Sequence, residues 1–183
     1  MLTVNHPWHG VPYGKNAPKE VTALIEIPQG SRSKYEIDKA TGLLRLDRVI
    51  YSSFHYPVNY GFIPRTLGQD NDPLDILVLC SQVIQSLCLV DAKVIGNMQM
   101  IDNGEEDDKI IAVACTDPSV NHINDINELP QHFFNELKHY FEQYKVLENK
   151  EVKIEEFQNK EVAYNVINDA IKFYEQKYPN QGA

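Results

Sequence analysis

Short apolar runs separated by turn residues fill the chain from residue 20 to residue 115 and constrain its fold more than any other feature. Five of them have the length of a β-strand: 21–27, 34–38, 43–49, 76–80 and 87–95. We also expect 98–101 to pair with 110–115 across a turn at Asn103-Gly104. Short strands at this spacing are typical of a β-sandwich or a small barrel.

The pattern changes after Pro118. Apolar residues at helical spacing predict a helix that begins near Pro130, with one face formed by Phe133, Leu137, Tyr140/Phe141, Tyr144 and Leu147. Residues 152–154 form a short candidate strand, and Asn159 is placed to cap a last helix. That helix would bury Val162, Val166/Ile167, Ala170/Ile171 and Tyr174. The sequence therefore predicts a β-barrel with two helices against it.

Bulk properties indicate a single domain over residues 1–183, with 43% hydrophobic residues and no linker. The net charge of −9 disfavours a nucleic-acid partner, because binding to phosphates needs a basic face. We see neither a signal peptide nor an apolar stretch long enough to cross a membrane. The three cysteines (Cys80, Cys88 and Cys115) lack a CxxC motif, so we expect buried free thiols in a reducing cytoplasm.

Three carboxylates lie within six residues in Asp70-Asn71-Asp72-Pro73-Leu74-Asp75. Such a cluster stays ionised only when water screens it or positive charge neutralises it. A solvated turn would satisfy the first condition, and hard divalent cations such as Mg²⁺, Mn²⁺ or Ca²⁺ would satisfy the second. Pro73 stiffens this loop, which favours a built site.

A second acidic stretch runs from Asp102 to Lys109 between two apolar runs. Alone it is typical of a solvated hairpin loop. Together with the first cluster it predicts two acidic loops on one sheet that converge on the same ions.

Several other residues suit a polyanionic ligand. Lys34 and Glu36 share one face of a predicted strand, although such a pair is usually a surface feature. The segment 56–64 is either an aromatic-packed connection or a rigid loop that presents tyrosine hydroxyls to a polar site. Metal ions with Lys and Arg around a phosphoryl group are the setting of phosphoryl transfer.

Three other classes fit less well. An EF-hand loop is interrupted by Pro73 and lacks its Gly and its terminal Glu. In an aspartyl-phosphate phosphatase the nucleophilic Asp ends a buried strand, whereas 65–69 is not such a strand. A barrel that binds oligonucleotides conflicts with the net negative charge.

The loop 70–76 resembles the DxDPxD signature of family I soluble inorganic pyrophosphatases. Further blocks resemble that family in order and spacing: 25–28, 34–38, Asp47-Arg48, 56–61, 102–109 and Tyr144-Lys145. The length resembles the short bacterial form. The resemblance implies an OB-like five-stranded barrel with helices at its side, Mg²⁺-dependent hydrolysis of pyrophosphate, and a homohexamer.

The resemblance also implies site roles. Asp72 corresponds to the general base. The implied metal ligands are Asp70, Asp75, Asp102, Asp107 and Glu36, with Mn²⁺ as an alternative ion. The implied phosphate-binding residues are Lys34, Arg48, Tyr60, Tyr144 and Lys145, and the supporting residues are Glu26, Tyr56 and Lys109. Asn103 departs from the Glu that some members carry, which leaves this position without a predicted metal role.

Overall fold

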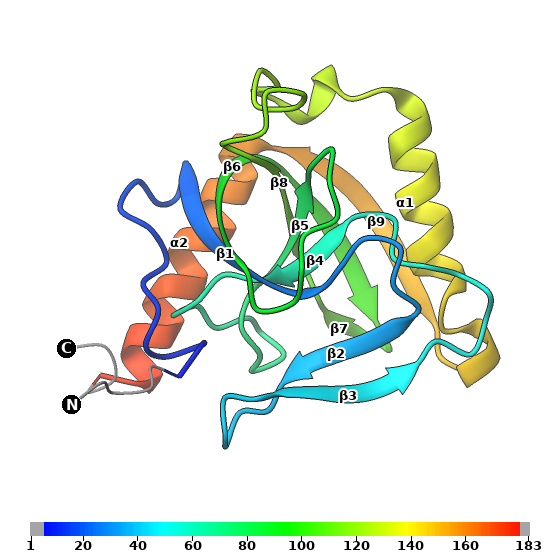
Figure 1. Cartoon of the computed structure of the whole chain (residues 1–183), viewed down its shortest axis with the longest axis horizontal. Coiled ribbons are helices and arrows are strands. Elements are labelled where there is room, and N and C mark those ends of the chain that lie inside the picture. Colours follow the sequence, from blue (N-terminus) through cyan, green and yellow to red (C-terminus); the bar gives the residue numbers. More distant parts are fainter. Residues whose placement is uncertain (1–5, 180–183) are drawn as a thin grey trace.

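Five strands close into a ring in the computed structural model, which describes residues 6–179 (Figure 1). Their order around the ring is β1 (Glu20–Ile27), β4 (Asn59–Phe62), β5 (Asp75–Leu79), β8 (Lys109–Ala114) and β6 (Leu89–Asp102), and β1 pairs with β6 to close it. Only β5 and β8 run parallel among these neighbours. The prediction of a mainly β, OB-like five-stranded fold with two helices is confirmed.

The remaining elements extend or cover this ring. A hairpin of β2 (Ser33–Ile37) and β3 (Leu44–Val49) forms a separate sheet, while β7 (Glu105–Glu106) and β9 (Val152–Asn159) both pair with β6. The α-helices are α1 (Gln131–Gln143) and α2 (Lys160–Lys177), and the 3₁₀ turns are η1 (Ile126–Glu128) and η2 (Val146–Glu148). Within residues 6–179, no helix has the length and apolar character needed to cross a membrane.

The central strands bury both of their faces. Ile76 of β5 lies in a core with Ile167 of α2, whereas its neighbour Leu77 lies in a second core with Leu137 of α1. Because successive side chains of a strand point to opposite faces, two-sided burial requires an unbroken apolar run. This explains why β5 after Asp75 and β8 after Lys109 are apolar, and why one helix covers each core.

The pairing predicted for the acidic hairpin is wrong in register. Asn103 and Gly104 both have positive φ, at 51° and 88°, and they form a two-residue turn that places Asp102 opposite Glu105. Such a turn fixes the register of its strands. Residues 98–101 therefore lie opposite 106–109, while 110–114 pair with 92–97 within one continuous strand β6.

Strand β4 was not predicted, because Pro57 and Gly61 weaken the strand pattern of its segment. Gly61 is needed where β1 crosses closely: a Cβ atom at this position would lie 1.9 Å from the carbonyl oxygen of Leu24. Strand β9 is also longer than the predicted 152–154 and reaches Asn159.

The buried faces of the two helices match the predicted spacing of apolar residues, except at Val162 and Leu147. Asn159 caps α2, since its side chain accepts from the backbone N–H groups of Glu161 and Val162. The fully buried face of α2 is Ala163, Ile167, Ala170 and Tyr174, so Val162 lies at its margin. Leu147 is 61% exposed, contrary to expectation, because α1 ends at Gln143 and η2 turns this side chain outward.

The three cysteines are free thiols. Cys80 and Cys115 are half-buried, whereas Cys88 is exposed, so the expected burial is wrong for Cys88. Cys88 lies just before β6, where the chain enters the strand from a surface loop.

Candidate active site

A cleft of about 220 Å³ gathers the predicted site residues from distant parts of the chain. Its walls come from the β2–β3 hairpin, strands β1 and β4, the loop before β5, the β6–β8 connection and the end of α1. All predicted site residues except Arg48 and Tyr56 line it: Glu26, Lys34, Glu36, Tyr60, Asp70, Asp72, Asp75, Asp102, Asp107, Lys109, Tyr144 and Lys145.

The acidic loop before β5 is fixed by its own hydrogen bonds. Asp70 Oδ1 accepts from the backbone N–H of Asp72 at 3.0 Å, and the Gly68 N–H donates to the carbonyl oxygen of Asp72 at 2.7 Å. Asn71 has a φ of 68°, and its side-chain oxygen accepts from Lys177 of α2 at 2.8 Å. The loop thereby presents Asp72 half-exposed, with 50% of its side chain accessible.

Lys109 is the buried centre of the cleft, with only 2% of its side chain exposed. Its Nζ lies 2.6 Å from Asp75 Oδ2 and 2.9 Å from Asp107 Oδ1, and the Tyr60 hydroxyl donates to Asp75. Burial alone would lower the pKa of Lys109, but the carboxylates of Asp107 and Asp75 raise it above its ordinary value. Burial also raises the pKa of Asp75 to about 6, against the opposing effect of Lys109.

Other lysines pair with the remaining acidic residues. Lys145 binds Asp102, Lys34 binds Glu36, and Lys39 binds Asp72. Burial lowers the pKa of Lys145 despite its partner. For Lys34, burial acts in the same direction but is outweighed by Glu36, so the pKa rises.

Asp70 has no ion-pair partner among the residues that the structure describes. Burial raises the pKa of its carboxyl group, and the neighbouring carboxylates of Asp107 and Asp72 add to this effect. An unneutralised carboxylate beside two other acidic residues favours a bound cation.

The donor set suits hard divalent cations, since it consists of carboxylate oxygens. Within residues 6–179, no three acidic, His or Cys side chains are grouped closely enough to hold one ion as they stand. The reason is the lysine pairing, because the ammonium of Lys109 lies between Asp75 and Asp107. A cation bound here would supply the positive charge that the lysines now provide.

Arg48 and Glu26 tie the hairpin to the body of the protein. The Arg48 Nε donates to Glu148 at 3.0 Å, while its buried Nη2 has no hydrogen-bond partner among the described residues. Glu26 Oε1 accepts from the backbone N–H of Ile37 at 2.6 Å, and burial raises the pKa of Glu26 to about 8. Both contacts hold the strand pair that carries Lys34 and Glu36.

The tyrosines combine both roles that the segment 56–64 allowed. Tyr56 is buried, with its ring centroid 5.5 Å from that of Tyr60 and 5.3 Å from that of Tyr140, so it belongs to aromatic packing. Tyr60 instead turns its hydroxyl to Asp75. Tyr144 stacks on Tyr140, and burial raises the pKa values of Tyr60 and Tyr144 well above 10, so both phenols stay protonated donors.

Lys39, Trp8 and Glu148 are three of the site residues that were not predicted. Lys39 directly follows the predicted block 34–38, so its place in the hairpin turn was a usable signal. Trp8 lines the cleft from the N-terminal arm, and Glu148 pairs with Arg48 across 100 residues of sequence. Nothing local in the sequence indicates these last two contacts.

Comparison with known proteins identifies the family. The family model described as inorganic pyrophosphatase matches residues 23–175. Soluble inorganic pyrophosphatase 2 of Chlamydomonas reinhardtii is 49% identical over 176 residues, covering 96% of this chain and 92% of that protein. A soluble inorganic pyrophosphatase of Oryza sativa is 52% identical over 169 residues, covering 92% of this chain and 79% of the relative.

Solved structures agree with these sequence relatives. The inorganic pyrophosphatase from Thermus thermophilus matches with a TM-score of 0.89 and 37% identity, covering 92% of this chain and 99% of that one. The enzyme from Helicobacter pylori matches with a TM-score of 0.85 and 43% identity, covering 88% and 96%. The acidic loop, the lysine-rich cleft and the ring of strands thus occur in a chain that belongs to the inorganic pyrophosphatase family.

Proposed function

We propose that this chain hydrolyses pyrophosphate to two phosphates in the described cleft, with Mg²⁺ as its activating cation. The observation that carries this proposal is that one cleft joins a set of carboxylates with lysines and tyrosine hydroxyls. The carboxylates suit divalent cations, and the lysines and tyrosines suit the phosphate groups of the substrate.

We assign the metal ligands from the resemblance to the pyrophosphatase family, and all five of these residues line the cleft. Asp70, Asp75 and Asp107 hold the tightly bound ions, with Asp75 shared between two of them. Asp102 and Asp107 serve a further ion, and Glu36 helps to hold another. Mn²⁺ has the same preference for oxygen ligands and is the natural substitute for Mg²⁺.

Asp72 is the proposed general base. Its backbone is fixed by the loop while its carboxylate is half-exposed, so it is able to reach a water molecule in the cleft. Divalent cations held by the carboxylates of the cleft would acidify a water molecule and neutralise the phosphoryl oxygens. Asp72 then accepts the proton that this water loses as it attacks phosphorus.

The substrate is held by Lys34, Arg48, Tyr60, Tyr144 and Lys145. These side chains are donors, and charge-assisted hydrogen bonds to phosphate are the strong ones. The unpartnered buried Nη2 of Arg48 supports this role, because a buried N–H group without an acceptor costs free energy until a ligand supplies one. Glu26, Tyr56 and Lys109 position these groups: Glu26 binds the backbone of the β2–β3 hairpin, and Tyr56 and Lys109 contact Tyr60.

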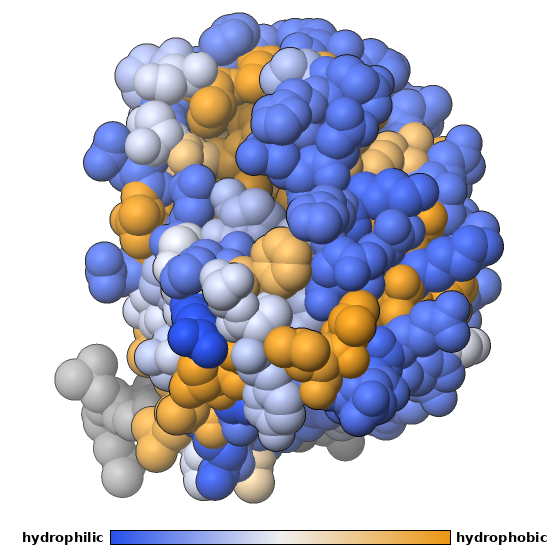
Figure 2. All heavy atoms as spheres, turned by 90° about the vertical axis from the view of Figure 1, so that its right-hand side faces the viewer, coloured by the Kyte–Doolittle hydropathy of each residue, from blue (hydrophilic) through white to orange (hydrophobic). Residues whose placement is uncertain are grey.

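We further propose a cytoplasmic homohexamer. Apolar patches interrupt the hydrophilic surface on the side of the molecule that carries α1 (Figure 2), which is typical of a surface that contacts another protein. Free thiols, one of them exposed, suit a reducing compartment.

Phosphate release from pyrophosphate tests the proposed function. We expect release with Mg²⁺, release with Mn²⁺, and none after treatment with EDTA. Adding Mg²⁺ in excess of the EDTA should restore the rate. A chain that releases no phosphate with either cation, or that releases it equally well in EDTA, would contradict the proposal.

A further inference from the structure

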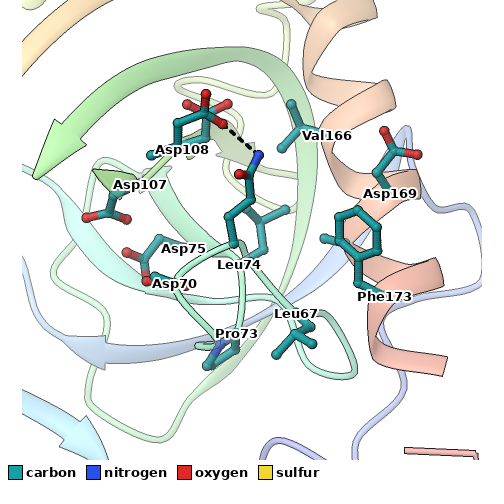
Figure 3. A pocket seen from close by; sticks show the side chains of 14 residues that line it. Leu67, Asp70, Pro73, Leu74, Asp75, Asp107, Asp108, Val166, Asp169 and Phe173 are labelled. Carbon is teal, nitrogen blue, oxygen red and sulfur yellow. Dashed lines mark hydrogen bonds between the residues drawn. The ribbon is translucent and has the colours of Figure 1, made fainter. Parts of the chain in front are cut away.

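A second pocket of about 170 Å³ lies between the acidic loop and helix α2 (Figure 3). Asp70, Pro73, Asp75 and Asp107 line both this pocket and the cleft. The side chains of the acidic loop therefore separate two cavities, and the roles proposed above use only one of them.

One wall of the second pocket is apolar. Val166 and Phe173 of α2 face Leu67 and Leu74 of the loop segment (Figure 3). Leu67 and Leu74 are buried, whereas Phe173 is 45% exposed and forms part of the rim. The backbone N–H of Leu67 donates to the carbonyl oxygen of Ala170 at 2.9 Å, so helix and loop are held together. This wall offers a preformed surface for a hydrocarbon or aromatic group.

The wall opposite α2 is acidic, and one further acidic side chain, Asp169, lies on α2 beside the apolar wall (Figure 3). Six of the fourteen lining residues are Asp or Glu, and none of the fourteen is Lys, Arg or His. Two of the six, Asp75 and Asp107, are neutralised by Lys109, and Asp169 pairs with Lys172 on the exposed side of α2.

The other three carboxylates have only neutral partners among the described residues. Asp70 accepts from the backbone of Asp72, and Glu106 accepts from the amide of Gln69 at 2.6 Å. Asp108 accepts from Asn97 at 3.1 Å through one oxygen, and its other oxygen is buried with no accepted hydrogen bond among the described residues. The pocket thus combines an apolar surface with three carboxylates that form no ion pair among the residues that the structure describes.

We propose that this second pocket binds a small organic cation, with an ammonium or amidinium group at the acidic wall and a hydrocarbon or aromatic body on the apolar wall. Charge complementarity excludes phosphate-like ligands here and favours a cation. A bare metal ion would leave the apolar wall without a contact. A planar amidinium can bind a carboxylate through two parallel hydrogen bonds, and its ring can pack on Phe173.

Binding in the second pocket should be coupled to the metal ions, and this part of the inference rests on the proposed function. Asp70, Asp75 and Asp107 contribute their negative charge to both cavities. Divalent cations in the cleft therefore weaken the attraction for an organic cation. Coupling of this kind is reciprocal, so the organic cation lowers the affinity for Mg²⁺ by the same factor.

Calorimetric titration of the metal-free full chain with benzamidinium tests the pocket directly, with benzamide as the neutral control of the same shape. We expect one benzamidinium per chain, bound at least about tenfold more tightly than benzamide. Val166→Trp fills the pocket and should abolish binding. Asp169→Asn should weaken it about threefold, whereas Asp91→Asn, an equal charge change on the exposed start of β6, should not.

Three further measurements keep the test valid even if a substituted chain fails to fold. Nuclear Overhauser contacts from the benzamidinium ring to Phe173 and Leu74 in the wild-type chain would place the ligand without any substitution. Asp169→Asn should leave Mg²⁺-dependent phosphate release unchanged. Saturating Mg²⁺ should raise the dissociation constant of benzamidinium several-fold.

The inference is overturned if benzamide binds as well as benzamidinium, or if Asp169→Asn and Val166→Trp both bind like the wild type. It is also overturned if benzamidinium lowers the sedimenting mass, because the pocket would then be an interface with a second copy of the chain. A benzamidinium affinity that ignores Mg²⁺ overturns the coupling. Failure of the proposed function would appear separately, as absent phosphate release in chains that still bind benzamidinium.

Discussion

Replacing Lys109 by methionine removes the ammonium group that Asp75 and Asp107 share while it keeps most of the side-chain volume. Lys109 is 2% exposed and Asp75 is 21% exposed, so water reaches these charges poorly. Removing one partner of a buried ion pair typically costs about 3–5 kcal/mol. Because Asp75 keeps some access to water, we expect the lower value, about 3 kcal/mol, for metal-free protein at pH 8.

The stability lost through Lys109→Met should be smaller at low pH than at high pH. Burial raises the pKa of Asp75 to about 6 in the folded protein, from an ordinary value of 3.8. The folded state thus holds this proton more tightly than the unfolded state, and the free energy of unfolding falls as the pH rises from 3.8 to about 6. Without Lys109 the pKa should rise further, so the variant should lose less stability at pH 5 than at pH 8.

Thermal unfolding in EDTA and in Mg²⁺ measures this effect. A loss of about 3 kcal/mol corresponds to a Tm lowered by roughly 6–12 °C for a chain of this size. Lys153→Met is the control, because that side chain is 64% exposed and should change Tm little. Mg²⁺ should raise the Tm of Lys109→Met more than that of the wild type. An equal Tm for Lys109→Met and wild type at pH 8 in EDTA, or an equal loss at pH 5, would refute the reasoning.

Three further outcomes are expected. Asp72→Asn should fold and bind metal but lower the hydrolysis rate by about 10²–10⁴-fold, whereas Asp75→Asn should weaken metal binding in a calorimetric titration. Millimolar fluoride should inhibit hydrolysis in Mg²⁺, because it replaces hydroxide between cations but cannot attack phosphorus; an unchanged rate would contradict this. His132 and His139 lie two turns apart on one face of α1. If that face contacts another subunit of a hexamer, acidification from pH 8 to 5.5 should dissociate the hexamer, and His139→Gln should resist this. An unchanged sedimenting mass at both pH values would contradict this prediction.

Motifs confined to one loop could be predicted because their residues are brought together by the local chain. Asp70 and Asp72 lie in one hydrogen-bonded turn before β5, Asp75 begins β5, and all three line the cleft. The contacts that neutralise them join distant residues: Lys39 with Asp72 and Lys109 with Asp75. Such pairs depend on where the hairpin lies beside the ring and where β8 lies within it, which no local pattern specifies.

The fold shows the same division between local and distant determinants. The spacing of apolar residues predicted β1 and both helices, because these elements bury the residues that form the pattern. The β2–β3 hairpin could be predicted from the turn at 39–42 between its strands, although few of its residues are buried. The register of β6 required the two-residue turn at Asn103-Gly104 to be recognised as closing directly on Asp102 and Glu105. Strand β4 required knowledge that β1 passes over Gly61, a contact between segments far apart in the chain.

The central claim is that the carboxylates of the cleft hold divalent cations that serve pyrophosphate hydrolysis. A crystal structure with Mn²⁺, pyrophosphate and fluoride tests it most directly, through anomalous scattering at the manganese edge. We predict at least two manganese peaks, one of them in contact with Asp70, Asp75 and Asp107, and pyrophosphate in contact with Lys34 and Lys145. Manganese or pyrophosphate bound only outside this cleft would contradict the account.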